Sequence, residues 1–248
     1  MSLHTFVILA YNESDDLEEC IKSILKQSKK SIVVIATSTP SDYILDIASR
    51  YGIGLMVNNS KSNKGSDYNY AISSANTKLV TIAHQDDLYN RNYTKEIIKA
   101  YKKNKDTSII FTDNYEIEKD KMIFKNKRLF RKRFYLYPLS IKRFQNSKYF
   151  KKRCLKKEKF ICTSSITFVK KNIPLDLFPT DYIYNNDWKG LLKLVELPYK
   201  FIFIKEKLVG YRIDNLNKNP LKYQEDEKIL KENYSKWYYD KIIKRKGD

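Results

Sequence analysis

Short apolar runs alternate with segments of helical periodicity over the first 113 residues of the chain. The run TFVILA (5–10) is typical of a strand buried in a parallel sheet. By contrast, Leu17, Cys20 and Ile24 recur at the spacing of one helix face. The pattern predicts strands at 5–10, 31–36, 54–57, 79–83 and 108–113, and helices at 17–25, 41–51, 67–75 and 94–103. This alternation implies an α/β fold with a mostly parallel central sheet flanked by helices.

The second half of the chain has a different character. Residues 119–159 hold 17 Lys or Arg against two acids, interleaved with Phe, Tyr and Leu, and are expected to form a basic insert. Strand-like sequence returns at 160–169 and 201–206, and a helix is predicted between them at 186–197. From residue 220 to the end, the charged and aromatic-rich sequence predicts a C-terminal helical extension.

The charge of the chain changes the range of partners to consider. The formal net charge is +19, and 31% of the residues are charged. Such a balance indicates an anionic partner, which is nucleic acid, an anionic membrane surface or a phosphorylated substrate. The alternative is a lysine-rich composition without functional meaning. Nucleic acid is disfavoured, because an ordered α/β domain with acids at its strand ends suits a phosphate polymer poorly.

Cysteine and histidine are sparse. Cys20, Cys154 and Cys162 form no CxxC pair, and the two histidines, His4 and His84, lie far apart in the sequence. A disulfide framework or a zinc site is therefore not expected, and a reducing cytoplasm fits this composition. No signal peptide is visible, and no apolar stretch approaches the roughly 20 residues that span a bilayer. We expect a cytoplasmic protein. Any association with the inner face of the cell membrane is expected to be peripheral.

Ligands of parallel sheets bind at the carboxyl ends of the strands, so the residues that follow each predicted strand are candidates for chemistry. The strand at 79–83 ends in the sequence HQDD, with Asp86 and Asp87 adjacent. Two adjacent carboxylates repel each other unless a cation lies beside them, and their hard oxygen atoms suit Mg2+ or Mn2+ that also binds a diphosphate. The alternative is a pair of loop residues that caps the next helix.

Two further elements are ambiguous on their own. The sequence NDW (186–188) opens a predicted helix, and Asp187 is either a capping residue or a carboxylate that takes a proton from an attacking hydroxyl. The sequence YNE (11–13) follows the first strand and is either a helix entry loop or a platform for a nucleotide base.

The order and spacing of AYNES (10–14), HQDD (84–87) and NDW (186–188) resemble glycosyltransferase family 2, over about residues 5–197 and more loosely to about residue 237. The resemblance implies a GT-A fold, and transfer of a sugar from a nucleoside diphosphate donor with inversion at the anomeric carbon. It also implies a need for Mn2+ or Mg2+. The expected parts are a nucleotide-sugar-binding half, a basic insert with the acceptor-binding half, and the C-terminal extension, at 1–118, 119–215 and 216–248.

The resemblance assigns roles residue by residue. Asp87 matches the residue that ligates the metal, and Asp86 matches one that faces the ribose or the donor sugar. Asp187 matches the catalytic base. The loop beside the uracil and the ribose is matched by Ala10, Tyr11 and Glu13.

The chain departs from the family pattern at several positions. The family's acidic pair after the second strand is replaced by ATST (36–39), which leaves a hydroxyl such as that of Thr37, or a backbone group, to contact the base. Tyr68 stands where an arginine is usual, next to Asn69, which we expect at the donor. His84 stands where an aspartate often stands.

The late element YRID (211–214) also departs, because the family usually has a histidine at its end. Arg212 is expected to neutralise a phosphate, and Asp214 is a candidate metal ligand. The resemblance thus implies an enzyme that glycosylates a saccharide or a lipid-linked saccharide of a bacterial surface polysaccharide, with Asp187 as the general base. The alternatives are a family member that binds nucleotides without catalysis and a basic nucleic-acid-binding protein.

Basic clusters in the expected insert raise the question of a membrane. They lie at 127–128, 131–133 and 151–153 and alternate with aromatic residues. Basic residues near an anionic bilayer and aromatic residues at its interface both favour binding, so the insert is expected to dock on a membrane surface. The alternative is a solvated basic face whose aromatic residues pack inward.

Overall fold

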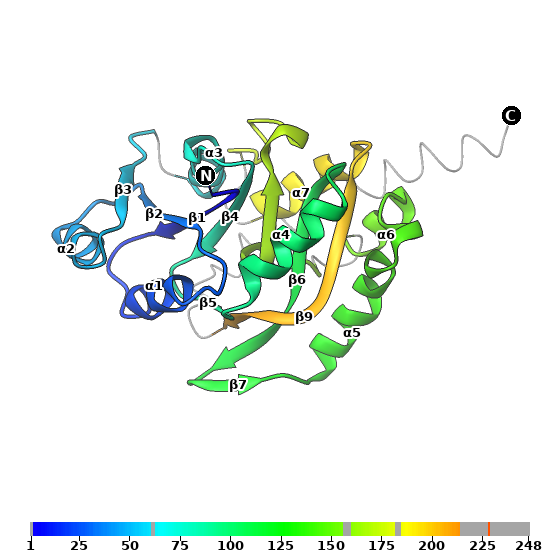
Figure 1. Ribbon diagram of the computed structural model, residues 1–248, viewed down its shortest axis with the longest axis horizontal. Coiled ribbons are helices and arrows are strands. Elements are labelled where there is room, and N and C mark those ends of the chain that lie inside the picture. The colour runs from blue at the N-terminus through cyan, green and yellow to red at the C-terminus, as the bar shows by residue number, and fades with distance from the viewer. Residues whose placement is uncertain (1, 61–62, 156–159, 182–184, 214–227, 229–248) are drawn as a thin grey trace, which may run out of the picture.

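The first half of the chain forms the parallel side of the central sheet (Figure 1). β1 (His4–Ala10) lies between β2 (Ile32–Thr37) and β4 (Leu79–His84), and β3 (Gly54–Val57) extends the sheet beyond β2, all in parallel pairs. The connecting helices are α1 (Leu17–Leu25), α2 (Asp42–Arg50) and α3 (Lys64–Ser74). Each crossover returns the chain to the same end of the sheet, which brings the carboxyl ends of these strands together.

The second half adds strands of both directions. β8 (Ile166–Val169) lies antiparallel between β4 and β6 (Thr107–Glu118), while the long β9 (Lys200–Arg212) runs parallel to β6 and then pairs with β5 (Leu88–Tyr89). β7 (Lys121–Ile123) forms a hairpin with β6. The remaining helices are α4 (Tyr93–Lys103), α5 (Lys127–Leu136), α6 (Lys148–Arg153) and α7 (Asn186–Glu196), and the 3-10 turn η3 (Thr163–Ser165) precedes β8.

Figure 1 is drawn from a computed structural model, and the structure describes residues 2–60, 63–155, 160–181, 185–213 and 228. Apart from Lys228, the predicted C-terminal helical extension lies outside the described residues, as does Asp214. Among the described helices, none has the length and apolar character needed to cross a bilayer.

Two apolar layers bury the two faces of the sheet. Phe6 and Ile8 of β1 point to the layer that contains α1, α2 and α4, whereas Val7 points to the layer that contains α3 and α7. Alternate residues of a strand point to opposite faces, so β1 is buried on both sides. The sequence of such a strand is apolar throughout, as the run TFVILA is.

The nine elements predicted before residue 113 are confirmed. α3 begins three residues earlier than predicted, because the side chain of Asn63 caps it by accepting the amide of Ser66. The strand predicted at 160–169 is wrong in its first part, where η3 stands. Residues 119–155 form β7, α5, α6 and short 3-10 turns, and the status of this segment as an insert stays a prediction.

Candidate functional site

The loop after β1 and the turn after β4 are tied together by one side chain. The amide nitrogen of Tyr11 donates to Oε1 of Gln85 at 2.8 Å, and Nε2 of Gln85 donates to the carbonyl of Tyr11 at 3.0 Å. The next amide, of Asn12, donates to Oγ1 of Thr39 after β2 at 2.7 Å. The loops that follow β1, β2 and β4 therefore meet at one end of the sheet, as the alternating pattern predicts.

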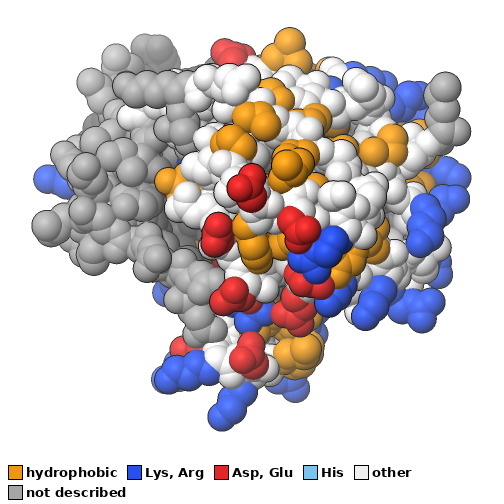
Figure 2. All heavy atoms as spheres, turned by 90° about the vertical axis from the view of Figure 1, so that its left-hand side faces the viewer, with side chains coloured by type: hydrophobic (Ala, Val, Ile, Leu, Met, Phe, Trp, Pro, Cys, Tyr) orange, Lys and Arg blue, Asp and Glu red, His pale blue; other side chains and the backbone are white. Residues whose placement is uncertain are grey.

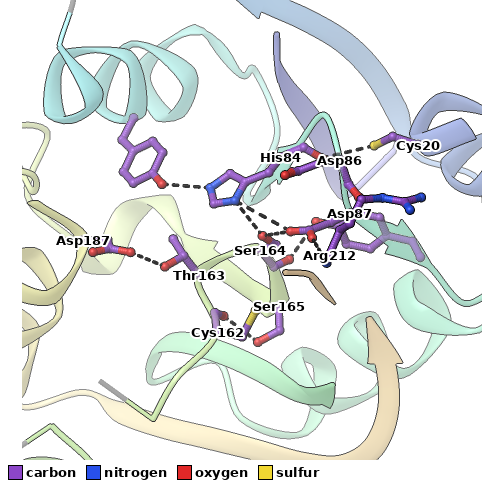
Figure 3. A network of polar contacts seen from close by, with 12 residues as sticks. Cys20, His84, Asp86, Asp87, Cys162, Thr163, Ser164, Ser165, Asp187 and Arg212 are labelled. Carbon is purple, nitrogen blue, oxygen red and sulfur yellow. Dashed lines mark hydrogen bonds and ion pairs between the residues drawn. The ribbon is translucent and has the colours of Figure 1, made fainter. Parts of the chain in front are cut away.

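Asp87 lies at the centre of this end of the sheet and is fully buried. Its Oδ1 accepts the backbone amide of Arg212 at 3.0 Å, and its Oδ2 accepts the hydroxyl of Ser164 (Figure 3). Burial, together with the charge of Asp86, raises the pKa of Asp87 well above its usual range. Burial also raises the pKa of Asp86.

These carboxylates fit a divalent cation. Ligand atoms of His84, Asp86 and Asp87 lie within 4.8 Å of one another, which is close enough for one ion. A buried acid next to a half-buried one, both with raised pKa values, is costly as a pair of anions, and a bound cation offsets that cost. Carboxylate oxygens are the ligands that Mg2+ and Mn2+ prefer.

Asp187 lies in the first turn of α7 and is 4% exposed. Its Oδ2 accepts the hydroxyl of Thr163 at 2.5 Å, and its Oδ1 accepts the amide of Trp188 at 2.8 Å. The residue at the N-cap position is Asn185, so Asp187 does not fill that position. The indole of Trp188 donates to the carbonyl of Leu155 at 2.8 Å, which anchors the start of the helix in the core.

Arg212 is the last residue of β9, and its side chain reaches α1. Its guanidinium contacts three carboxylates, at 3.1 Å for Asp16, 2.9 Å for Glu19 and 3.0 Å for Asp120. The side chain is therefore engaged with acids from two segments, the start of α1 and the turn between β6 and β7, while its backbone amide holds Asp87. The expected contact of Arg212 with a phosphate stays a prediction.

The other expected donor residues lie around the same end of the sheet. Tyr11 and Glu13 are exposed at the rim, and Ala10 is buried at the end of β1. The hydroxyl of Thr37 is buried and accepts the amide of Thr39 at 3.0 Å. The expected donor contacts of these residues stay predictions.

The side-chain amide of Asn69 has a partner inside the protein. Its nitrogen donates to the carbonyl of Phe178 at 2.7 Å, and its oxygen accepts the amide of the same residue at 2.9 Å. The amide therefore ties α3 to the segment before α7, and a donor contact would be an additional role.

Sequence reasoning missed several polar groups of the site. Thr163 and Ser164 of η3 bind the two key carboxylates, yet they lie in a segment that reads as a strand. Asp67 accepts from Ser38 at 3.2 Å, so a carboxylate of α3 lies beside the loop after β2 that lacks the acidic pair of the family. Asp67 lies in the first turn of α3, where an acidic residue is expected simply because it stabilises the helix, so the sequence did not mark it as part of a site.

The fold is an α/β fold with a mostly parallel sheet, and its acidic side chains gather where strands of that sheet end. Residues 5–173 match the family model described as glycosyl transferase family 2. The chain therefore belongs to this family and has a GT-A fold. No curated protein matches the chain.

Solved structures agree on the fold. Residues 1–349 of TarS from S. aureus align with 13% identity and a TM-score of 0.63, over 91% of this chain and 63% of that one. The mannosyltransferase PcManGT from Pyrobaculum calidifontis, in complex with GDP-Man and Mn2+, aligns with 16% identity and a TM-score of 0.62, over 87% and 58% of the two chains. TarS 1–349 with UDP-GlcNAc aligns with 14% identity and a TM-score of 0.60, over 87% and 59%. The chain thus spans about six tenths of each of these solved chains.

Proposed function

We propose that the protein is an inverting, metal-dependent enzyme that transfers a hexose from a UDP donor to a saccharide or lipid-linked saccharide of a bacterial surface polysaccharide. One observation carries this proposal. Neighbouring residues of η3, Thr163 and Ser164, bind the carboxylates of Asp187 and Asp87. A candidate base and a candidate metal ligand therefore lie on the two sides of a single turn (Figure 3).

Asp187 is the proposed general base. It would accept the proton of the acceptor hydroxyl as that oxygen attacks the anomeric carbon from the face opposite the diphosphate. Asp87 would ligate a divalent cation, with Asp86 beside the donor ribose or sugar and Asp214 as a further candidate ligand. Bound there, Mn2+ or Mg2+ would supply positive charge to the leaving diphosphate. Ala10, Tyr11, Glu13, Thr37, Asn69 and Arg212 are the proposed donor-contacting residues.

Ligands of the structural neighbours support a nucleotide-sugar donor. TarS was solved with UDP and with UDP-GlcNAc, and PcManGT with GDP-Man and Mn2+. The exposed Tyr11 and the hydroxyl-lined end of β2 are suited to stacking and hydrogen bonding with a base, and uracil is the base that the family resemblance favours.

The metal site is tested by Asp87→Ala. We expect this variant to lose Mn2+-dependent UDP binding in calorimetry, because it removes the buried ligand, whereas Asp46→Ala on the exposed surface of α2 leaves binding unchanged. Mn2+-dependent UDP affinity equal to that of the wild type, in a folded Asp87→Ala protein, would exclude Asp87 as the ligand.

Two other functions make different predictions. A family member that binds nucleotides without catalysis would bind UDP with Mn2+. In the absence of an acceptor, it would lack the slow hydrolysis of UDP-glucose or UDP-galactose that an active enzyme shows. A nucleic-acid-binding protein would bind oligonucleotides in a salt-sensitive way and would not bind UDP. Slow hydrolysis that is lost in Asp87→Ala supports the enzyme.

A further inference from the structure

Ser164 connects the proposed metal ligand with a line of other polar groups. Its hydroxyl donates to Oδ2 of Asp87 and lies 3.0 Å from Nδ1 of His84. On the other side of the ring, Nε2 of His84 lies 2.8 Å from the hydroxyl of Tyr68. Figure 3 shows the contacts of Ser164 with Asp87 and with His84. Ser164, Asp87 and Tyr68 have no exposed surface, so water does not compete for them.

The positions of the hydrogen atoms follow from donor and acceptor counting. An ionised Asp87, the form that binds a cation, only accepts hydrogen bonds. The single hydroxyl hydrogen of Ser164 therefore points to Asp87, and the contact with His84 requires a hydrogen on Nδ1. The other ring nitrogen is engaged by Tyr68, whichever of the two donates. Neither nitrogen of His84 then offers a lone pair to a metal ion.

Ser164 is itself held in place by buried groups. The hydroxyl of Tyr89 donates to the carbonyl of Ser164 at 2.7 Å, and the ring of Tyr68 stacks on that of His84 at 5.8 Å between centroids, with 13° between the planes. Both tyrosine side chains are buried. The hydroxyl of Ser164 is thus fixed before any ligand arrives, as outer residues of metal sites commonly are.

We propose that Ser164 is a positioning residue for the carboxylate of Asp87, and that His84 orients Ser164 and is not a metal ligand. This inference rests on the proposed function, since it takes Asp87 to bind a cation. The proposal also reduces the number of candidate metal ligands. Of His84, Asp86 and Asp87, only the two carboxylates remain. A site of oxygen ligands favours Mn2+ or Mg2+ over Zn2+.

Direct coordination is tested by pulsed EPR on the wild-type protein with Mn2+ and UDP. We expect no coupling from a metal-bound imidazole nitrogen. The chain has only two histidines, and His4 is buried against Ser31 and Thr81, so such a coupling would come from His84. An imidazole coupling that disappears in His84→Asn would overturn the proposal.

Positioning is tested by Mn2+ affinity in the presence of UDP. Ser164→Ala should weaken Mn2+ binding by about tenfold or more, the usual effect of removing an outer partner of a metal ligand. His84→Asn should stay within about threefold of the wild type, because its amide nitrogen stands as many bonds from the backbone as Nδ1 and can donate to Ser164. His84→Leu cannot donate and should resemble Ser164→Ala.

The results of these experiments distinguish a failure of the positioning role of Ser164 from a failure of the proposed metal site. Thermal unfolding confirms that each variant is folded, and His84→Asn keeps the test decisive if His84→Leu does not fold. Unchanged affinity in Ser164→Ala, with normal binding by the wild type, would overturn the positioning role alone. Absence of Mn2+ binding to the wild type would overturn the metal site of the proposed function, and this proposal with it.

Discussion

At the scale of single residues, the environment of Asp187 suits a base that must stay oriented. Both carboxylate oxygens accept hydrogen bonds, from Thr163 and from the amide of Trp188, and these bonds fix the direction in which a remaining lone pair points. Asparagine has the same shape but cannot take a proton from a hydroxyl.

Asp187→Asn should therefore keep UDP affinity and lose sugar transfer by roughly 10²-fold or more. Transfer is measured with the donor that a nucleotide-sugar panel identifies by thermal shift with Mn2+. Asp181→Asn, an exposed aspartate before the same helix, is the control and should transfer normally. A near-normal rate in Asp187→Asn would place the base elsewhere.

The burial of His4 affects the stability of the protein and makes that stability depend on pH. It is fully buried between Ser31 and Thr81, each at 2.8 Å, and burial lowers its pKa to about 3. The ordinary value of about 6.5 applies to the unfolded chain. The unfolded state thus binds the proton more readily between these values, so this contribution to stability is complete above pH 6.5 and declines as the pH falls toward 3.

The expected size of this decline is about 2 kcal/mol between pH 7 and pH 5. Urea unfolding of the wild type and of His4→Gln at both pH values measures it. The wild type should lose about 2 kcal/mol more than the variant, because glutamine does not titrate. Parallel losses in the two proteins would contradict the burial of a neutral imidazole.

At the scale of elements, the periodicity of apolar residues was sufficient to predict the first half of the fold, where strands and helices alternate. Strands buried on both faces and amphipathic helices each have a distinct pattern, so β1 to β4 and the helices between them could be predicted. The strand ends also placed Asp86 and Asp87 beside the loop of Tyr11. The role of η3 could not be predicted, because hydroxyls in a short turn have no distinguishing pattern. Ser164 meets Asp87 across 77 residues of sequence.

The attachment of α6 to the rest of the protein could not be predicted from the sequence either. It depends on a lysine that the sequence analysis places in a basic cluster expected at the surface. Lys151 is fully buried, and its ammonium donates to the carbonyls of Leu197 at 3.3 Å and Tyr199 at 2.5 Å. These carbonyls follow the last turn of α7. A lysine near a helix C-terminus satisfies carbonyls that have no partner within the helix.

Lys151→Met should destabilise the protein by about 1–3 kcal/mol, because it leaves two partly buried carbonyls without this donor. Lys148→Met is the control on the same helix: Lys148 is half-exposed and pairs with Glu196, so its loss should cost less than about 1 kcal/mol. Urea unfolding compares them. Equal stability of Lys151→Met and the wild type would show that α6 is held by apolar contacts alone.

At the scale of the whole molecule, the charge of +19 is unevenly distributed. The face that carries α1 and α2 has acidic side chains gathered at its middle with some Lys or Arg among them, and most of its visible Lys and Arg lie toward its edges (Figure 2). Residues 119–155 hold 14 Lys or Arg and one acid. Such a separation suits a protein that meets an anionic partner with one part of its surface.

The predicted basic clusters do not all face solvent. Lys132 and Lys151 are buried, and Arg128 and Arg133 form ion pairs with Glu116 and Asp113. The exposed side of α5 instead combines Lys127 and Arg131 with Phe130 and Phe134, whose side chains are 76% and 60% exposed. Phenylalanines this exposed bury little apolar surface, and cations in the first turn oppose the helix dipole. A role outside folding explains both.

We predict that this side of α5 binds anionic membranes. Sedimentation with liposomes should show binding that rises with anionic lipid and weakens at high salt. Each basic residue near such a surface contributes about 1 kcal/mol, so Lys127→Gln with Arg131→Gln should reduce binding roughly 30-fold. Phe130→Ser with Phe134→Ser should also reduce it. Lys102→Gln with Lys103→Gln on α4 removes equal charge and should leave binding nearly unchanged.

The control decides between a local site and a general effect of charge. Equal losses in the α4 and α5 double variants would mean that only net charge matters and that α5 has no special role. Wild-type protein that stays in the supernatant with anionic liposomes at low salt would exclude membrane docking through this segment. Its positive charge would then serve the diphosphate or another acidic acceptor. Cations attract such anions within about one Debye length, roughly 10 Å at 0.1 M salt, without help from the phenylalanines.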